Sequence, residues 1–160
     1  MAEIRLSSRD FEEGGEIPKR CGYKHGNERP QLTLHPVPDE TTALALIMDD
    51  PDAMAAVGKV WIHWLFYYNA ENGEYPYDLA QFGGDGSGIV NTYGIHGKTD
   101  FGEIGYGGPA PPDKRHTYVF KAYALDVDLD LNEGYSKEEL EDAMKGHILA
   151  EAKLTGTFAP

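Results

Sequence analysis

A dense apolar run at residues 44–48 is followed directly by a cluster of aspartates. A run of this density predicts a buried strand. Asp49, Asp50 and Asp52 come next, and Pro51 is expected to stop regular pairing, so that all three carboxylates fall in a loop at the end of the strand. A polar turn, in which aspartates bond to nearby backbone amides, would produce the same pattern. The loop alone therefore does not indicate a site.

Residues 60–68 show the clearest strand pattern, because they are rich in aromatic and β-branched side chains. Shorter strands are expected at residues 4–6, 32–34 and 154–158, and a longer one at 117–125. On this last strand His116, Tyr118 and Phe120 face one way. In the 60–68 segment, alternation predicts one face made of Trp61, His63, Leu65 and Tyr67, and the other made of Ile62, Trp64, Phe66 and Tyr68.

A capping box at residues 136–139 predicts the start of a helix near the C-terminus. The apolar stripe expected for that helix contains Leu140, Ala143, Met144, His147 and Ile148. Residues 72–112 hold more than half of the glycines and are predicted to be mostly loop. The pattern favours a single, mainly β domain over residues 1–160, antiparallel or mixed, with a C-terminal helix and short helical segments.

The composition excludes several classes of protein. The 160 residues carry 27 acids against 14 bases, a formal charge of −13, which opposes binding to nucleic acid or to anionic membranes. Cys21 is the only cysteine, so neither an internal disulfide nor a paired-thiolate zinc site can form. We find no signal peptide and no apolar run long enough to span a bilayer. A cytoplasmic protein without integral membrane association is expected.

Three polar side chains are predicted to meet at one edge of the sheet. Asp50 follows one strand, His63 lies near the start of the next, and His116 begins a third. If both later strands run antiparallel to the first, the carboxylate and the two imidazoles share a pocket. Each histidine alone has a simpler explanation, because His63 could be a core residue bonded to a backbone carbonyl and His116 a solvated turn residue.

A second feature is the loop at 105–112, which precedes His116 and contains adjacent glycines and several prolines. Adjacent glycines allow backbone amides to converge on an anion, and prolines make the loop rigid. Such a loop is more often a connector, and it lacks the spacing of a P-loop. Its position beside His116 makes it a candidate part of the pocket.

The order of these motifs resembles that of the phosphatidylethanolamine-binding proteins, also called Raf-kinase-inhibitor-like proteins, and most closely their bacterial and archaeal branch. Residues 50–54 are similar to the motif D-P-D-A-P, and residues 63–64 to H-W. Residues 105–112 resemble G-Y-G-G-P-C-P-P, with Ala110 in place of Cys, and residues 116–118 resemble H-R-Y. The resemblance extends over nearly the whole chain and implies a β-sandwich of two sheets.

The resemblance also implies a pocket for phosphate or a phosphorylated headgroup, with no cofactor, no metal and no catalytic residue. Three departures bear on phosphate affinity: Met54 replaces Pro, Thr117 replaces Arg, and Cys21 and Tyr23 are interchanged. Loss of the Arg removes a positive charge and an ion pair with an acid such as Asp52. The predicted ligand-binding residues are Asp50, Asp52, His63, Tyr106, Gly107, Gly108, Pro109, His116 and Tyr118.

An anion beside Asp50 in so acidic a protein needs a compensating charge. We expect His63 and His116 to supply it, with one or both cationic near neutral pH, because a neighbouring Asp raises the pKa of a histidine. Glycine-loop amides and the Tyr118 hydroxyl would add donors, and binding would strengthen from neutral pH toward about 6.

Two other functions remain open at this point. Asp50, His63 and His116 could form a facial triad in a metal-dependent hydrolase. The resemblance also allows an interaction module that inhibits serine proteases or modulates a kinase, with Tyr75, Tyr77 and Phe82 contributing to docking. A homodimer is one assembly to consider.

Overall fold

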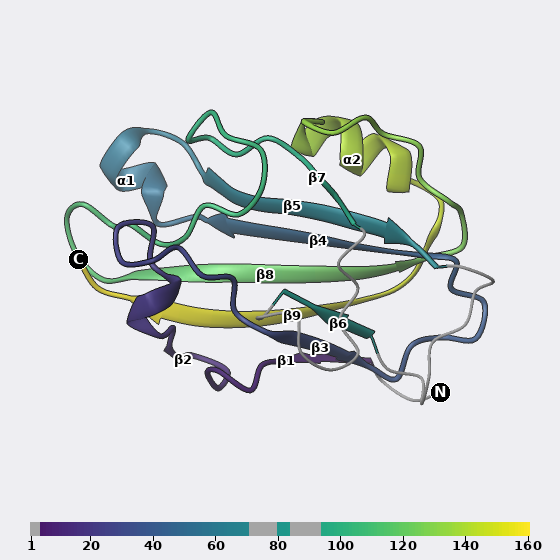
Figure 1. Ribbon diagram of the computed structural model, residues 1–160, viewed down its shortest axis with the longest axis horizontal. Helices are drawn as coiled ribbons and strands as arrows, with labels where there is room; N and C mark the ends of the chain where they lie inside the picture. The colour runs from purple at the N-terminus through teal and green to yellow at the C-terminus, as the bar shows by residue number, and fades with distance from the viewer. Residues whose placement is uncertain (1–3, 71–79, 84–93) are drawn as a thin grey trace.

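The structure, a computed structural model, describes residues 4–70, 80–83 and 94–160 of the chain. Its described strands form two sheets, one with six strands in the order β2-β9-β8-β4-β5-β7 and one with three in the order β1-β3-β6 (Figure 1). The β2–β9 pair is parallel and the other pairs are antiparallel. The predicted mainly β fold, with two sheets and a C-terminal helix, is confirmed.

The elements follow the chain in a simple order. The N-terminal part contains β1 (Arg5–Ser7), β2 (Gly15–Glu16), the 3-10 helix η1 (Lys19–Cys21) and β3 (Leu32–His35). The middle contains β4 (Ala43–Asp50), α1 (Ala53–Val57), β5 (Trp61–Asn69), β6 (Ala80–Phe82) and β7 (Ile95–His96). The last third contains β8 (His116–Leu125), α2 (Lys137–Met144) and β9 (Ile148–Phe158). None of the described helices is long and apolar enough to cross a membrane.

The strand β4 lies in the middle of the large sheet, and all eight of its residues are buried. Leu44, Leu46 and Met48 belong to the core cluster that also includes side chains of the small sheet. Ala45 and Ile47 face the other way, into a second cluster that includes residues of α2. Burial on both faces explains why the run is continuously apolar, as is typical of strands covered on both sides.

The aspartates after this run are not all in a loop, which corrects the prediction. Asp49 and Asp50 are the last two residues of β4, because the antiparallel partner β5 pairs with both of them and β8 pairs with Asp49. Asp49 is directed to the α2 side, where its Oδ2 lies 3.8 Å from Nζ of Lys137. Pairing does stop at Pro51, and Asp52 is the N-cap of α1. The three carboxylates therefore lie in three different environments: Asp49 on the α2 side of the sheet, Asp50 at the end of β4 and Asp52 at the start of α1.

A β-bulge in β5 alters the predicted faces of that strand. Met48 pairs with Trp64 but Asp49 pairs with Ile62, so His63 is an extra residue with no partner on β4. Residues 64–68 alternate as predicted, whereas Ile62 packs with the cluster on the α2 side. The ring of His63 instead contacts Tyr118 of the other cluster, with centroids 5.1 Å apart. Strict alternation would have placed His63 with Leu65, on the α2 side of the sheet.

The C-terminal helix begins as predicted and ends earlier. The Ser136 hydroxyl accepts from the Glu139 amide at 3.1 Å, and the Glu139 carboxylate accepts from the Ser136 amide at 3.2 Å. The helix ends at Met144, shortly before Gly146, whose φ of 83° is a left-handed conformation that favours glycine. His147 and Ile148 therefore lie outside the apolar stripe.

Candidate functional site

The predicted polar residues are brought to one end of the large sheet by its antiparallel pairing. Asp50 ends β4, whereas His63 lies near the start of β5 and His116 and Tyr118 at the start of β8. In Figure 1 this end of the sheet is on the left, next to α1 and the C-terminus. The ring of Tyr118 lies between the two imidazoles, with centroids 5.1 Å from His63 and 6.3 Å from His116.

His116 is held by a carboxylate at each of its ring nitrogens. Its Nδ1 lies 2.6 Å from Oδ2 of Asp50, and its Nε2 lies 2.7 Å from Oδ1 of Asp113. The residue is only 1% exposed. Burial by itself lowers the pKa of His116, but the hydrogen bonds to Asp50 and Asp113 outweigh it and raise the pKa overall. Both nitrogens can donate only when the ring is protonated, so the arrangement favours an imidazolium.

The carboxylate of Asp50 is a buried and incompletely satisfied group. Burial raises its pKa, although the hydrogen bond with His116 acts in the opposite direction. Among the residues described, Oδ1 of Asp50 and Nε1 of Trp61 are buried and have no partner in hydrogen-bond geometry, although the Tyr118 hydroxyl and the Asp52 amide also interact with the Asp50 carboxylate. These two residues are register partners on β4 and β5. An unpaired acceptor and an unpaired donor thus belong to one pair of neighbouring residues, at the same end of the sheet.

His63 has a different role from the one predicted. Its Nδ1 is bonded to the carbonyl oxygen of Gly107 at 2.7 Å, and the amide of Gly107 donates to the carbonyl of His63 at 2.8 Å. Burial lowers the pKa of His63 to about 4. The ring is therefore neutral near pH 7, so His63 is not the histidine that supplies positive charge. The alternative of a core histidine bonded to a backbone carbonyl describes it better.

The glycine loop does not offer the amides that were expected to bind an anion. The amide of Gly107 is used by His63, and the amide of Gly108 donates to Oδ1 of Asn27 at 2.7 Å. Asn27 in turn donates to the carbonyl of Tyr106 at 2.9 Å, and the Tyr106 hydroxyl donates to the carbonyl of Cys21 at 2.8 Å. These bonds attach the loop to the segment that follows η1.

Close approach explains the glycines of this loop. A Cβ on Gly108 would lie 1.9 Å from the carbonyl oxygen of Cys21, and one on Gly107 would lie 2.5 Å from the ring of Phe101. Pro109 contributes its carbonyl, which accepts from the amide of Tyr23 at 3.0 Å. The glycines are thus required by packing between two segments, a use that the sequence pattern does not distinguish from an anion cradle.

Tyr118 is fully buried, and its pKa is raised by that burial and by the nearby charge of Asp50. Asp52 lies on the surface at the start of α1, where its Oδ2 accepts from the backbone amide of Thr117 at 2.8 Å. The ion pair expected to be lost with the family's Arg is absent, and Asp52 bonds to the backbone of Thr117 instead. Met54, in the same helix, is 54% exposed and makes this surface partly apolar.

The site has two chemically distinct parts. The carboxylate side, defined by Asp50, Asp113 and His116, carries charge and includes one exposed group, since the Asp113 side chain is 40% exposed. The loop side, defined by His63, Gly107 and Gly108, is neutral, buried and bonded to neighbouring backbone and to Asn27. Among the predicted residues, Asp50, His116, His63 and Tyr118 come together. Tyr106 and Pro109 instead bond the loop to Cys21 and Tyr23.

Two important residues were missed by the sequence analysis. Asp113 precedes His116 by three positions, and this short spacing was the signal that could have identified it. Asn27 carries no such signal, because the partners of its side chain are distant in the sequence. The bond from Gly108, for example, joins residues 81 positions apart.

A cavity of about 430 Å³ is lined in part by Phe158, the register partner of His116 on β9. None of the predicted binding residues lines it. Its walls are Glu16, Ile17, Pro18, Lys19, His25, Phe158, Ala159 and Pro160.

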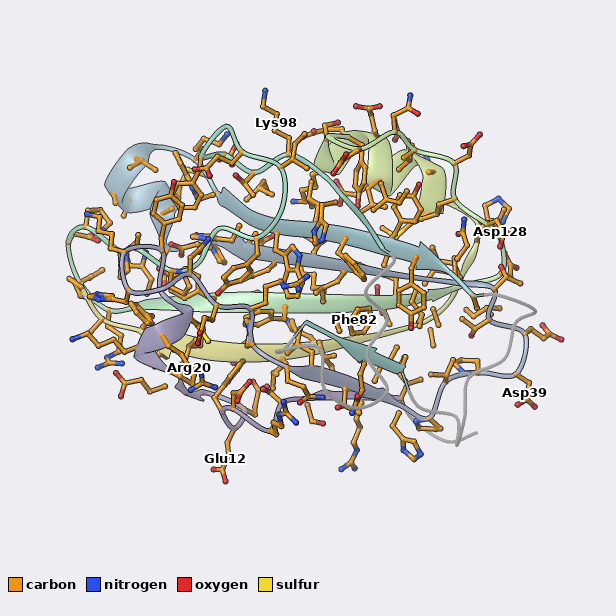
Figure 2. All side chains as sticks on the ribbon, viewed as in Figure 1. Glu12, Arg20, Asp39, Phe82, Lys98 and Asp128 are labelled. Atoms are coloured by element: carbon orange, nitrogen blue, oxygen red, sulfur yellow. The ribbon has the colours of Figure 1, made fainter. Side chains whose placement is uncertain are left out.

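The facial triad considered for a metal is not formed. Within residues 4–70, 80–83 and 94–160, no group of three or more His, Cys, Asp or Glu side chains is arranged to hold a metal ion. The hydrogen bonds explain this, because the nitrogens of His116 both face carboxylates and Nδ1 of His63 faces a backbone carbonyl. The docking residues Tyr75 and Tyr77 lie outside the described residues. Phe82 is fully buried between the sheets and is not a docking residue (Figure 2).

The sequence matches the family model of the phosphatidylethanolamine-binding protein over residues 7–159. The chain belongs to the phosphatidylethanolamine-binding protein family. Similar proteins occur in bacteria and archaea. A UPF0098 protein of Chlamydia muridarum is 40% identical over 157 residues, which are 97% of this chain and 98% of the relative. A UPF0098 protein of Methanothermobacter thermautotrophicus shows the same identity and the same coverage of both chains.

Two solved structures share the fold of this chain. A homologue of the family from Chlamydia trachomatis is 38% identical, with a TM-score of 0.83, and the match covers 99% of this chain and 98% of the other. YbcL from E. coli is 27% identical, with a TM-score of 0.79 and 98% of each chain covered. The resemblance suggested by the motifs at 50–54, 63–64, 105–112 and 116–118 is thereby confirmed.

Proposed function

We propose that this family member is a non-enzymatic binding protein for a small oxyanion, namely phosphate or a phosphate monoester, on the carboxylate side of the site. The supporting observation is the geometry of His116. Its Nε2 already holds an anionic oxygen at 2.7 Å, and the ring is poised to be an imidazolium. A hydrogen bond from a charged donor to an oxyanion is about twice as strong as one between neutral groups.

The unpaired atoms of Asp50 and Trp61 support the same proposal. Buried polar groups are rarely left unpaired, so Oδ1 of Asp50 and Nε1 of Trp61 indicate that a further polar group belongs beside them. A protonated phosphate has both a P–OH donor for the carboxylate and an oxygen acceptor for the indole. In this arrangement one carboxylate oxygen of Asp50 orients His116, and the other accepts a hydrogen bond from the P–OH group of the ligand.

The surrounding charge limits the ligand. Asp50, Asp52 and Asp113 surround a single imidazolium in a protein of net charge −13, so a singly charged anion fits better than a doubly charged one. The predicted pH dependence rests on one imidazole, because the pKa of His63 is lowered and that of His116 is raised. Affinity should fall as the pH rises through the raised pKa of His116, where the positive charge is lost.

The test is a titration with sodium phosphate and with O-phosphoethanolamine, followed by calorimetry and by the NMR shifts of the His116 ring. The wild type is compared with His116→Asn and with His147→Asn. His147 is the matched control, because it is also bonded to an aspartate, Asp126 at 2.9 Å, but lies outside the site. We expect His116→Asn to weaken phosphate binding about 10- to 100-fold, the effect of losing one charged hydrogen bond.

A second series distinguishes the two sources of the phosphate group. Tighter binding of O-phosphoethanolamine than of phosphate, together with sedimentation on vesicles containing phosphatidylethanolamine, would identify a lipid headgroup. Equal binding of both small molecules without sedimentation would identify free phosphate monoesters. The proposal is wrong if the wild type binds neither small molecule, or if His116→Asn binds them as well as His147→Asn does.

A further inference from the structure

The two carboxylates on His116 differ in how firmly they are fixed. Asp50 is part of β4, and its side chain is 4% exposed. Asp113 lies in the loop before β8, and its side chain is 40% exposed. Both bonds to the ring are short, at 2.6 Å and 2.7 Å. One carboxylate therefore belongs to the core, whereas the other reaches the ring from the surface.

The outer carboxylate uses the donor that an external anion would need. Nδ1 of His116 is taken by the core residue Asp50, so Nε2 is the remaining charged donor of the ring. Slight burial raises the pKa of Asp113, but the bond from His116 and bonds from neighbouring backbone amides lower it overall, so this carboxylate is ionised at neutral pH. The titratable groups around the ring are Asp50, Asp52, His63, Asp113 and Tyr118.

We propose, on the basis of the function proposed above, that Asp113 is an internal competitor for the anion site, whose carboxylate occupies the ligand position on Nε2 of His116 and withdraws when an external anion binds. Asp113 is the carboxylate that can leave, because its side chain is 40% exposed and water can solvate its charge once it withdraws. Movement of Asp50 would instead leave a buried charge unpaired.

The competition has two consequences for binding. Part of the free energy of anion binding is used to displace Asp113, so the apparent affinity is lower than the site allows. The displaced carboxylate also stays close to the ligand and disfavours a second negative charge. Asp113 therefore sets both the affinity of the pocket and its preference for singly charged anions.

The experiment compares phosphate and acetate affinities of the wild type with those of Asp113→Ala, Asp113→Asn and the control Asp126→Asn. The control removes an exposed aspartate that is bonded to a histidine elsewhere, since Asp126 pairs with His147 and its side chain is 43% exposed. We expect Asp113→Ala to bind phosphate about 5- to 10-fold more tightly, which is about 1 to 1.4 kcal/mol. Asp113→Asn should show a smaller gain in phosphate affinity, and Asp126→Asn should show no change. At pH 8 the Asp113 variants should gain less affinity for acetate than for phosphate.

A ligand-free measurement accompanies the titrations: the pKa of the His116 ring, followed by NMR, should fall in Asp113→Ala and stay unchanged in Asp126→Asn. The outcomes separate the two proposals. If the wild type binds phosphate and Asp113→Ala binds it equally or more weakly, the competitor role of Asp113 is overturned and the proposed function stays intact. Binding by Asp113→Ala alone supports both. Absence of anion binding in every variant, with folding confirmed by circular dichroism, overturns both.

Discussion

The carboxylate side and the loop side of the site begin from the same kind of residue, a buried histidine, and differ in what holds it. His116 is bonded to two carboxylates, and its pKa is raised. His63 is bonded to the carbonyl of Gly107, and burial lowers its pKa to about 4. Both rings have little exposed surface, but His63 lies deeper, so burial dominates its pKa, whereas the two carboxylates dominate that of His116.

This difference separates the proposed binding site from its structural support within one cluster of residues. The carboxylate side contains a charge, an exposed group and unpaired buried atoms, which are the features of a site that exchanges ligands. The loop side has its amides and carbonyls bonded to other segments, as expected of a support. Substitutions on the loop side should therefore act on stability, and those on the carboxylate side on ligand and pH.

The largest effect is expected from Gly108→Ala on the loop side. The added Cβ would lie 1.9 Å from the Cys21 carbonyl oxygen, so the loop must move and the bond from Gly108 to Asn27 is lost. We expect a loss of about 3 kcal/mol or more in the free energy of unfolding, measured with urea. The control is Gly102→Ala, which meets no atom within 4 Å but has a φ of 84°, and which should cost about 1 to 2 kcal/mol. Because Gly108 does not have a positive φ, a loss no larger than that of Gly102→Ala would show that the loop relieves the close approach easily.

A loss of about 3 kcal/mol is also expected for His63→Ala near neutral pH, because the substitution leaves a cavity and removes the bond to Gly107. The wild type should lose stability as the pH falls from about 6.5 toward 4, since the unfolded chain binds a proton that the buried ring excludes. His96, whose pKa is also lowered to about 4, contributes in the same direction. His63→Ala should therefore show a shallower decline in acid than the wild type. An unchanged acid profile would show that His63 is not a buried neutral ring.

The opposite pH dependence is expected on the carboxylate side. A raised pKa means that His116 stabilises the fold below the unfolded pKa of about 6.5 and that this stabilisation is lost as the pH rises through the folded pKa. His116→Asn should lower the free energy of unfolding by about 1 to 2 kcal/mol at pH 6. The loss should be smaller at pH 9, because there the wild-type ring is deprotonated and no longer makes its charged hydrogen bonds to the two carboxylates. Urea denaturation at the two pH values measures this. A cost that grows with pH would contradict an imidazolium between two carboxylates.

The smallest effect is expected from Asp52→Asn, at the surface of the carboxylate side. An Asn side chain can still accept from the Thr117 amide, a bond of 2.8 Å in the wild type, so the loss of stability should be below about 1 kcal/mol. Removal of one negative charge near His116 should nevertheless favour anion binding slightly. Calorimetry with phosphate checks this, and a weakened affinity would indicate that Asp52 contacts the ligand.

The sequence predicted the elements of this fold better than the contacts inside its site. The strands and the capping box follow from local patterns, since alternation and a Ser-to-Glu spacing of three are properties of neighbouring residues. The meeting of Asp50 with His116 was predicted from antiparallel pairing. The roles of His63 and Gly108 were not, because they depend on the bulge in β5 and on Asn27, which are set by register and by contacts distant in the chain.

The bulge at His63 limits how this site could be transferred to another scaffold. Copying the side chains onto a regular strand would turn the imidazole toward the α2 face, whatever residue types were chosen. The transferable unit is therefore an insertion together with the residues around it, and deleting a single residue from the start of β5 should dismantle the loop side without altering one of its side chains.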